Sequence, residues 1–159
     1  MVWGAIWAGG RSDLVIMERD EESKRGGYSA RSYQLVLEDQ IPRCWQPGLI
    51  FMQDNAPIHT AGKINTWFDN HGITRTDWPP YSPDLNPIEH VWAKLKLWVL
   101  EHYPELLEMG KTEEAYQALY NALNEGWDAM RQSMIDGLIR SMDSRVNAVI
   151  AAKGWYTRY

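Results

Sequence analysis

The stretch Trp78-Pro-Pro-Tyr-Ser-Pro-Asp-Leu-Asn-Pro-Ile-Glu-His-Val-Trp92 carries a proline-rich loop directly into a helix in this 159-residue chain. Asn86 is a preferred N-cap residue, and Pro87 suits the first helical position. Glu89 therefore falls in the first turn, held behind a rigid loop. The apolar residues that follow recur at helical spacing and predict one buried stripe: Ile88, Val91, Trp92, Leu95, Trp98 and Val99.

A second acidic residue, Asp54, ends an apolar run in Leu49-Ile-Phe-Met-Gln-Asp-Asn-Ala-Pro-Ile-His59. The run has the length of a strand that is covered on both faces, and open α/β sheets bind ligands at the carboxyl ends of their strands. Between Asp54 and Glu89 lie 34 residues. Two carboxylates at a strand end and a helix start fit a two-magnesium phosphoryl-transfer site.

Each carboxylate also has a structural alternative. Asp-Asn before Ala-Pro is ordinary turn chemistry, so spacing alone leaves Asp54 balanced between a metal ligand and a turn residue. Glu89 lies three residues after Asn86, where a capping-box glutamate reaches back to the cap amide. The residues by themselves favour this capping alternative for Glu89.

The segments around both carboxylates resemble catalytic motifs of the Tc/mariner superfamily of transposases. Gln53-Asp54-Asn55-Ala56-Pro57-Ile58-His59 is similar to the second motif, and Ser82-Pro83-Asp84-Leu85-Asn86-Pro87-Ile88-Glu89 is similar to the third. The 34-residue spacing is also that of the family, and the resemblance extends from Val2 to Tyr159.

The resemblance implies a DDE catalytic domain with an α/β, ribonuclease-H-like fold, in which helices flank a mixed sheet. It implies that Asp54 and Glu89 are catalytic residues that bind two Mg²⁺ or Mn²⁺ ions. The family reaction cuts DNA at transposon ends and joins it to a target. On this resemblance both the turn and the capping alternatives become the less favoured interpretations.

The resemblance further implies a first, central strand that carries the first Asp of the triad. The chain begins at Met1-Val2-Trp3-Gly4, already at the second strand, so we expect this strand to be absent. Asp13 and Asp20 flank the wrong strand and do not match the missing Asp. We expect residues 1–159 to form a single catalytic-domain fragment that is not competent alone. The alternatives are a non-catalytic remnant that binds nucleic acid or protein, and a stand-alone ribonuclease-H-like nuclease.

Three polar residues near the carboxylates are further candidates. His59 could orient a ligand or contact a phosphate, although such a histidine is more often a surface or capping residue. Asn55 is a better candidate for supporting the adjacent ligand. Asp84 is a rival carboxylate, but its Ser-Pro-Asp turn indicates a structural role. The later basic residues are scattered, which favours a solvated helix face over a DNA contact: Arg140, Arg145, Lys153 and Arg158.

Composition indicates a globular chain, with 45% hydrophobic residues and a single cysteine that excludes an internal disulfide. No apolar run reaches the length of a membrane span, and the N-terminus does not resemble a signal peptide. We expect a soluble protein that is not secreted and that is nuclear in a eukaryotic host. The net charge of −5 argues against DNA binding. The resemblance implies that basic recognition helices lie in a separate N-terminal region.

The expected secondary structure begins with a hairpin from Val2 to Met17, closed by a primed turn at Ala8-Gly9-Gly10-Arg11. Strands are expected at Leu49–Gln53 and Ile73–Trp78. The expected helices are Ala30–Gln40, Thr60–Asn70 with a stop at His71-Gly72, Asn86 to about residue 102, Thr112–Met130 and Ser133–Lys153. Without a central strand, the edges of Val2–Trp7 and Leu49–Gln53 are expected to promote self-association.

Overall fold

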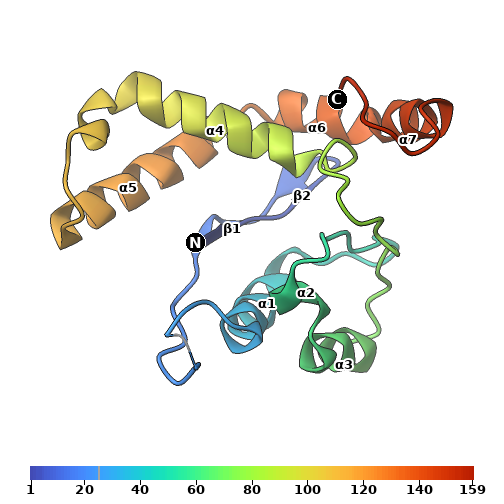
Figure 1. Cartoon of the computed structure of the whole chain (residues 1–159), viewed down its shortest axis with the longest axis horizontal. Helices are drawn as coiled ribbons and strands as arrows, with labels where there is room; N and C mark the ends of the chain where they lie inside the picture. Colours follow the sequence, from blue (N-terminus) through green and yellow to red (C-terminus); the bar gives the residue numbers. More distant parts are fainter. Residues whose placement is uncertain (25) are drawn as a thin grey trace. The chain divides into compact units, whose positions relative to one another are not determined.

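The structure is a computed structural model that describes residues 1–24 and 26–159 (Figure 1). It divides into two compact units, and each is described by itself. The first unit comprises Met1–Gly4 and Val15–Tyr81, and the second comprises Ala5–Leu14 and Ser82–Tyr159. The single domain expected for residues 1–159 stays a prediction.

The hairpin predicted between Val2 and Met17 is confirmed. Its antiparallel pairs are β1 (Val2–Trp3) with β4 (Val15–Ile16) and β2 (Ile6–Trp7) with β3 (Gly10–Arg11). The primed turn predicted on the paired glycines was wrong: Trp7 pairs with Gly10, so Ala8 and Gly9 are the central residues, and of these only Gly9 has a positive φ, at +85°. This is the sign pattern of a type II turn, which spares Ala8 the strain of the left-handed region.

Three helices belong to the first unit: α1 (Ala30–Cys44), α2 (Pro57–Thr60) and α3 (Gly62–Asn70). α1 runs four residues beyond its predicted end at Gln40 and includes Pro42 in its last turn. Ile41 is buried there, and its carbonyl accepts a hydrogen bond from the Trp45 N–H at 2.8 Å. The burial of Ile41 thus extends the helix past the position that the proline indicated.

The predicted stop at His71-Gly72 is confirmed. Gly72 has a φ of +64°, and its N–H donates to the Asp69 carbonyl at 3.2 Å. The Ile73 N–H donates to the Phe68 carbonyl at 3.1 Å. These two bonds form a Schellman motif, in which a left-handed glycine lets the chain turn back and pair the last helical carbonyls.

The two strands predicted in the first unit are reduced to a single parallel bridge between Phe51 and Arg75. The Phe51 N–H donates to the Thr74 carbonyl at 2.8 Å, and the Thr76 N–H donates to the Phe51 carbonyl at 2.9 Å. Ile50 is 62% exposed, so the prediction of a strand covered on both faces was wrong. Among the described residues, no other strand pairs with this bridge.

The second unit is mainly helical. Its helices are α4 (Ile88–His102), the short 3₁₀ helix η1 (Pro104–Leu107), α5 (Glu113–Ala129), α6 (Gln132–Arg140) and α7 (Met142–Ala151). The single helix predicted for Ser133–Lys153 was wrong, because the chain breaks at Ser141. The Ser141 hydroxyl donates to the Leu138 carbonyl at 2.6 Å, a local bond that competes with continued helix.

Each unit has its own apolar core. The core of the first unit is centred on α1 and α3, and its most buried side chains are Tyr33, Leu37, Ile64 and Phe68. In the second unit, Trp127 of α5 is buried, stacks on Trp92 of α4 at 5.3 Å and donates to the Ser12 carbonyl at 2.9 Å. None of the helices in the described ranges combines the length and apolarity that a membrane crossing requires.

Candidate metal-binding carboxylates

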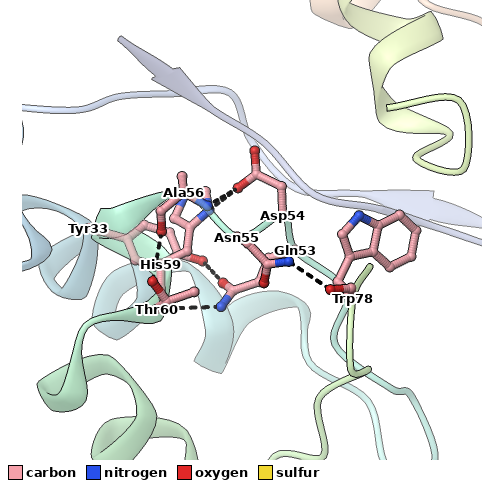
Figure 2. A network of polar contacts seen from close by, with 8 residues as sticks. All are labelled: Tyr33, Gln53, Asp54, Asn55, Ala56, His59, Thr60 and Trp78. Carbon is pink, nitrogen blue, oxygen red and sulfur yellow. Dashed lines mark hydrogen bonds and ion pairs between the residues drawn. The ribbon is translucent and has the colours of Figure 1, made fainter. Parts of the chain in front are cut away.

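Asp54 lies in the turn between the Phe51 bridge and α2 (Figure 2). Its Oδ1 accepts a hydrogen bond from the Ala56 N–H at 3.0 Å and lies 2.6 Å from His59 Nδ1. The other carboxylate oxygen points away from this network (Figure 2), and the side chain is 56% exposed. Asp54 is therefore a turn residue through one oxygen and remains available to a ligand through the other.

His59 is directed at Asp54 rather than into solvent, and its side chain is 21% exposed. A carboxylate can only accept hydrogen bonds, so the imidazole donates from Nδ1. The imidazole ring also lies against Tyr33, with the ring centroids 4.4 Å apart. Of the two interpretations of His59, this geometry supports the one in which it orients a ligand.

The Asn55 side chain contacts the backbone of Trp78, and its role in supporting a ligand stays a prediction. Its Nδ2 donates to the Trp78 carbonyl at 2.7 Å, so the side chain holds the start of the proline-rich loop (Figure 2). Trp78 itself is 9% exposed and belongs to the core of the first unit. Asn55 thus ties the Asp54 turn to the loop whose sequence leads on to Glu89.

Glu89 is exposed in the first turn of α4. The Asn86 side chain accepts from the Ile88 N–H at 3.4 Å, as a cap would, although the helix is assigned from Ile88. The Asn86 N–H donates to the Pro83 carbonyl at 3.0 Å. The cap amide is therefore already paired, which removes the partner that a capping-box Glu89 would need.

Asp84 has the structural role that its turn indicated. Its Oδ2 accepts hydrogen bonds from the Thr157 N–H at 3.2 Å and the Thr157 hydroxyl at 2.7 Å. Its backbone carbonyl accepts from Arg145 Nη1 at 2.5 Å. These bonds fix the loop that precedes Glu89 to the C-terminal segment of the same unit.

Arg145 is 2% exposed, so the solvated helix face predicted for it was wrong. Its Nε donates to the Ser141 hydroxyl at 2.8 Å, and its guanidinium lies 4.8 Å from the centre of the Tyr159 ring. Burial lowers the pKa of Arg145 below its ordinary value. From this buried position Arg145 connects α7 to the Asp84 turn.

Two residues of the Asp54 network were not recognised from sequence. The Tyr33 hydroxyl donates to Gln53 Oε1 at 2.6 Å, and Gln53 Nε2 donates to the His59 carbonyl at 3.2 Å. Burial raises the pKa of Tyr33 above its ordinary range. Tyr33 lies in no motif of the sequence, but a polar Gln53 at the end of an apolar run was a signal that a partner is needed.

Asp54 belongs to the first unit and Glu89 to the second. No group of three or more His, Cys, Asp or Glu side chains that could hold a metal ion occurs within the described part of the chain. Exposed carboxylates are the oxygen ligands that Mg²⁺ and Mn²⁺ prefer. The donor chemistry of Asp54 and Glu89 therefore fits such an ion, with each residue offering one carboxylate.

Residues 20–108 match the family described as DDE superfamily endonuclease. The Tc1 transposase of Caenorhabditis elegans is 40% identical over 168 residues, which cover 100% of this chain and 54% of that protein. The Tcb2 transposase of Caenorhabditis briggsae is 39% identical over 132 residues, which cover 80% of this chain and 45% of that protein. The chain thus spans about half the length of these relatives.

Solved structures of similar fold include the Mos1 transposase catalytic domain with Raltegravir and Mg. It has a TM-score of 0.68 at 19% identity and covers 99% of this chain and 84% of its own. The Mos1 strand transfer complex has a TM-score of 0.64 at 24% identity and covers 82% of this chain and 37% of its own. These structural likenesses confirm the mixed α/β fold expected of a ribonuclease-H-like domain.

Proposed function

The chain belongs to the DDE superfamily of endonucleases and, within it, to the Tc/mariner transposases, and on that premise we propose that Asp54 and Glu89 bind the divalent metal ions of a DNA strand-transfer site. The substrates would be transposon ends and target DNA. In a eukaryotic host the protein would act in the nucleus. With a net charge of −5, this chain would rely on basic regions elsewhere for most DNA contacts.

The observation that carries the proposal is that the Asp54 carboxylate is exposed and is anchored through only one of its oxygens. Oδ1 is held by the Ala56 N–H and by His59, whereas the second oxygen points away from these donors (Figure 2). A metal ligand needs this combination, because one anchored oxygen fixes the orientation and the other is left to bind the ion. Glu89 supports the proposal, since the amide that would have engaged it as a cap is bonded to Pro83.

Mg²⁺ or Mn²⁺, when bound, would activate the attacking oxygen and stabilise the leaving oxygen of the phosphodiester. The residues of this chain would hold and orient the bound ion. Asp54 presents a carboxylate from a hydrogen-bonded turn, and Glu89 presents one from the first turn of α4. We propose that none of these 159 residues supplies the third carboxylate that the family resemblance implies, and that they alone would not complete the reaction.

A titration with Mn²⁺, with free ion measured by electron paramagnetic resonance, tests the two ligands. We expect Asp54→Asn and Glu89→Gln each to weaken Mn²⁺ binding by at least about tenfold, because even residues that merely support a ligand have effects of this size. Matched controls are Asp77→Asn in the same unit as Asp54 and Glu101→Gln on the same helix as Glu89. Both control side chains are exposed, and both variants are expected to bind as the parent does.

Other outcomes point to other functions. If Asp54→Asn and Glu89→Gln bind Mn²⁺ as well as the parent, the metal-site proposal is wrong and a non-catalytic binding remnant is favoured. We also expect the 159-residue chain to lack DNA cleavage and strand transfer. Robust cleavage that Asp54→Asn abolishes would instead favour a stand-alone nuclease whose third ligand is another residue.

A further inference from the structure

A chain of contacts connects the buried face of α1 to the Asp54 carboxylate within the first unit (Figure 2). Tyr33 is 1% exposed, and its hydroxyl donates to Gln53 Oε1 at 2.6 Å. Gln53 Nε2 in turn donates to the His59 backbone carbonyl at 3.2 Å. The Tyr33 ring also contacts the His59 imidazole directly, at 4.4 Å between centroids.

His59 is thereby held at two places, its ring and its carbonyl, and both contacts lead back to one tyrosine. A free imidazole can rotate and can carry its proton on either nitrogen. Here the ring is confined with Nδ1 2.6 Å from Asp54 Oδ1, which requires the proton on Nδ1. The short α2 helix, only Pro57–Thr60, makes no side-chain cap of its own and gives little independent rigidity.

We propose that Tyr33 is a positioning residue of the metal site: through its ring and through Gln53 it holds His59 in the Nδ1–H form against Asp54 Oδ1, so that a divalent ion binds the other Asp54 oxygen. This inference rests on the proposed role of Asp54. It assigns a function to a tyrosine whose sequence pattern indicates only helix packing. Tyr33 acts through His59 and does not touch the metal.

The burial of Tyr33 explains why this arrangement is well defined. A buried hydroxyl without a partner would bear the full cost of desolvation, so the bond to Gln53 is strongly preferred to none. Gln53 in turn has its Oε1 used by Tyr33 and its Nε2 used by the His59 carbonyl. Loss of the tyrosine therefore releases Gln53 and the imidazole together.

The test uses the 159-residue chain labelled with ¹⁵N-histidine, observed by NMR at about pH 8.5, where free imidazole is neutral. The parent is expected to show His59 in the Nδ1–H form, assigned by its disappearance in His59→Gln. Tyr33→Phe keeps the ring contact but loses the hydroxyl, and we expect a partial shift toward the Nε2–H form. Tyr33→Leu loses both contacts, and we expect that form to dominate. Manganese affinity should fall in the same order, by about tenfold in Tyr33→Leu.

Controls separate positioning from general stability. Val36→Ala removes packing from the same buried face of α1, and we expect a lower melting temperature with an unchanged His59 tautomer and unchanged Mn²⁺ affinity. His71 and His102 serve as internal references. Their Nδ1 atoms lie 2.7 Å from the Trp67 carbonyl and 2.8 Å from the Trp98 carbonyl, so they should report Nδ1–H forms in every variant.

The outcomes distinguish the role inferred for Tyr33 from the proposed metal-binding role of Asp54. If Asp54→Asn weakens Mn²⁺ binding but Tyr33→Leu leaves both the tautomer and the affinity unchanged, the role of Tyr33 is overturned and the metal site stands. If Asp54→Asn has no effect on Mn²⁺ binding, the metal site itself is overturned, and the role of Tyr33 falls with it. An equal tautomer shift in Val36→Ala would also overturn the inference, because it would show loss of packing alone.

Discussion

Asp54, Asp84 and Asp136 each hold two donors on one carboxylate oxygen, yet they differ in their exposure to solvent. Asp84 accepts two bonds from Thr157 on a single oxygen, and a third, from Arg145, on its carbonyl. Asp136 accepts from Gly9 and from Gln132. Asp54 combines an anchored oxygen with a second oxygen that points away from its network. All three therefore leave one carboxylate oxygen outside these bonds, and what separates Asp54 is its exposure, since Asp84 and Asp136 are half-buried.

Asp136 provides a pH-dependent prediction. Hydrogen bonds from the Gln132 side chain and the Gly9 N–H lower the pKa of Asp136 in the folded chain. A lowered carboxyl pKa contributes stability that is present above the unfolded value, about 3.9, and is lost as the pH falls through the folded value. We expect Asp136→Asn to be less stable than the parent above about pH 5, with the difference vanishing at lower pH.

Urea unfolding of both proteins from neutral to acidic pH measures this difference. Asp128→Asn is the control, because Asp128 is exposed near the end of α5 and Arg11 bonds its backbone carbonyl, which the substitution keeps. Its stability should follow that of the parent across the series. A difference for Asp136→Asn that stays constant to low pH would contradict the charged hydrogen bonds assigned to Asp136.

At the scale of elements, α4 and α5 pack through a glycine. A Cβ added at Gly126 would lie 2.6 Å from Trp98 Cε3 and 2.7 Å from Leu95 Cδ1, both on α4. Gly137 lies inside α6, is exposed, and has no heavy atom within 4 Å of the same added position. Close packing of α4 on α5 therefore requires a glycine at Gly126, whereas packing does not require one at Gly137.

We expect Gly126→Ala to destabilise the protein by about 1–3 kcal/mol, because overpacking forces the helices apart or the rings out of place. Gly137→Ala should be neutral or stabilising by up to about 1 kcal/mol, since alanine is the better helix former. Chemical denaturation of the two variants gives both values. Equal effects of the same sign would show that α4 and α5 do not approach closely at Gly126.

At the scale of the whole molecule, the chain covers about half of its transposase relatives and presents apolar side chains at a weakly paired segment. The Phe51–Arg75 bridge is the only pairing of that segment among the described residues, and Ile50 beside it is 62% exposed. Exposed strand edges with apolar side chains promote association between chains. We therefore propose that the 159-residue chain self-associates through this edge.

Ile50→Lys is expected to reduce that association, because a charge on an edge disfavours pairing with a second chain. Sedimentation velocity over a concentration series measures the effect. Leu107→Lys is the matched control: Leu107 is 72% exposed, but it belongs to the short helix η1 and not to a strand. A parent chain that is monomeric at every concentration, or equal effects of the two variants, would contradict the role of the edge.

Local patterns were sufficient for much of the secondary structure. Helix starts and stops depend on hydrogen bonds between residues a few positions apart, so Asn86-Pro87 and His71-Gly72 could be interpreted without knowledge of the fold. The hairpin and the position of Glu89 in a first turn followed in the same way. The pairing of Asp54 and Glu89 as candidate ligands came from a motif resemblance, and their joint site stays a prediction.

Contacts between distant residues decided the rest. Where strands were predicted at Leu49–Gln53 and Ile73–Trp78, the structure has one bridge. The length of a strand depends on partners that its own residues do not specify. Arg145 is buried by its bonds to Ser141 and Asp84, although its helical position gave no sign of it. The contacts of Tyr33 with His59 and with Gln53 join separate segments of chain, so they exist only once packing has brought α1 and the Asp54 turn together.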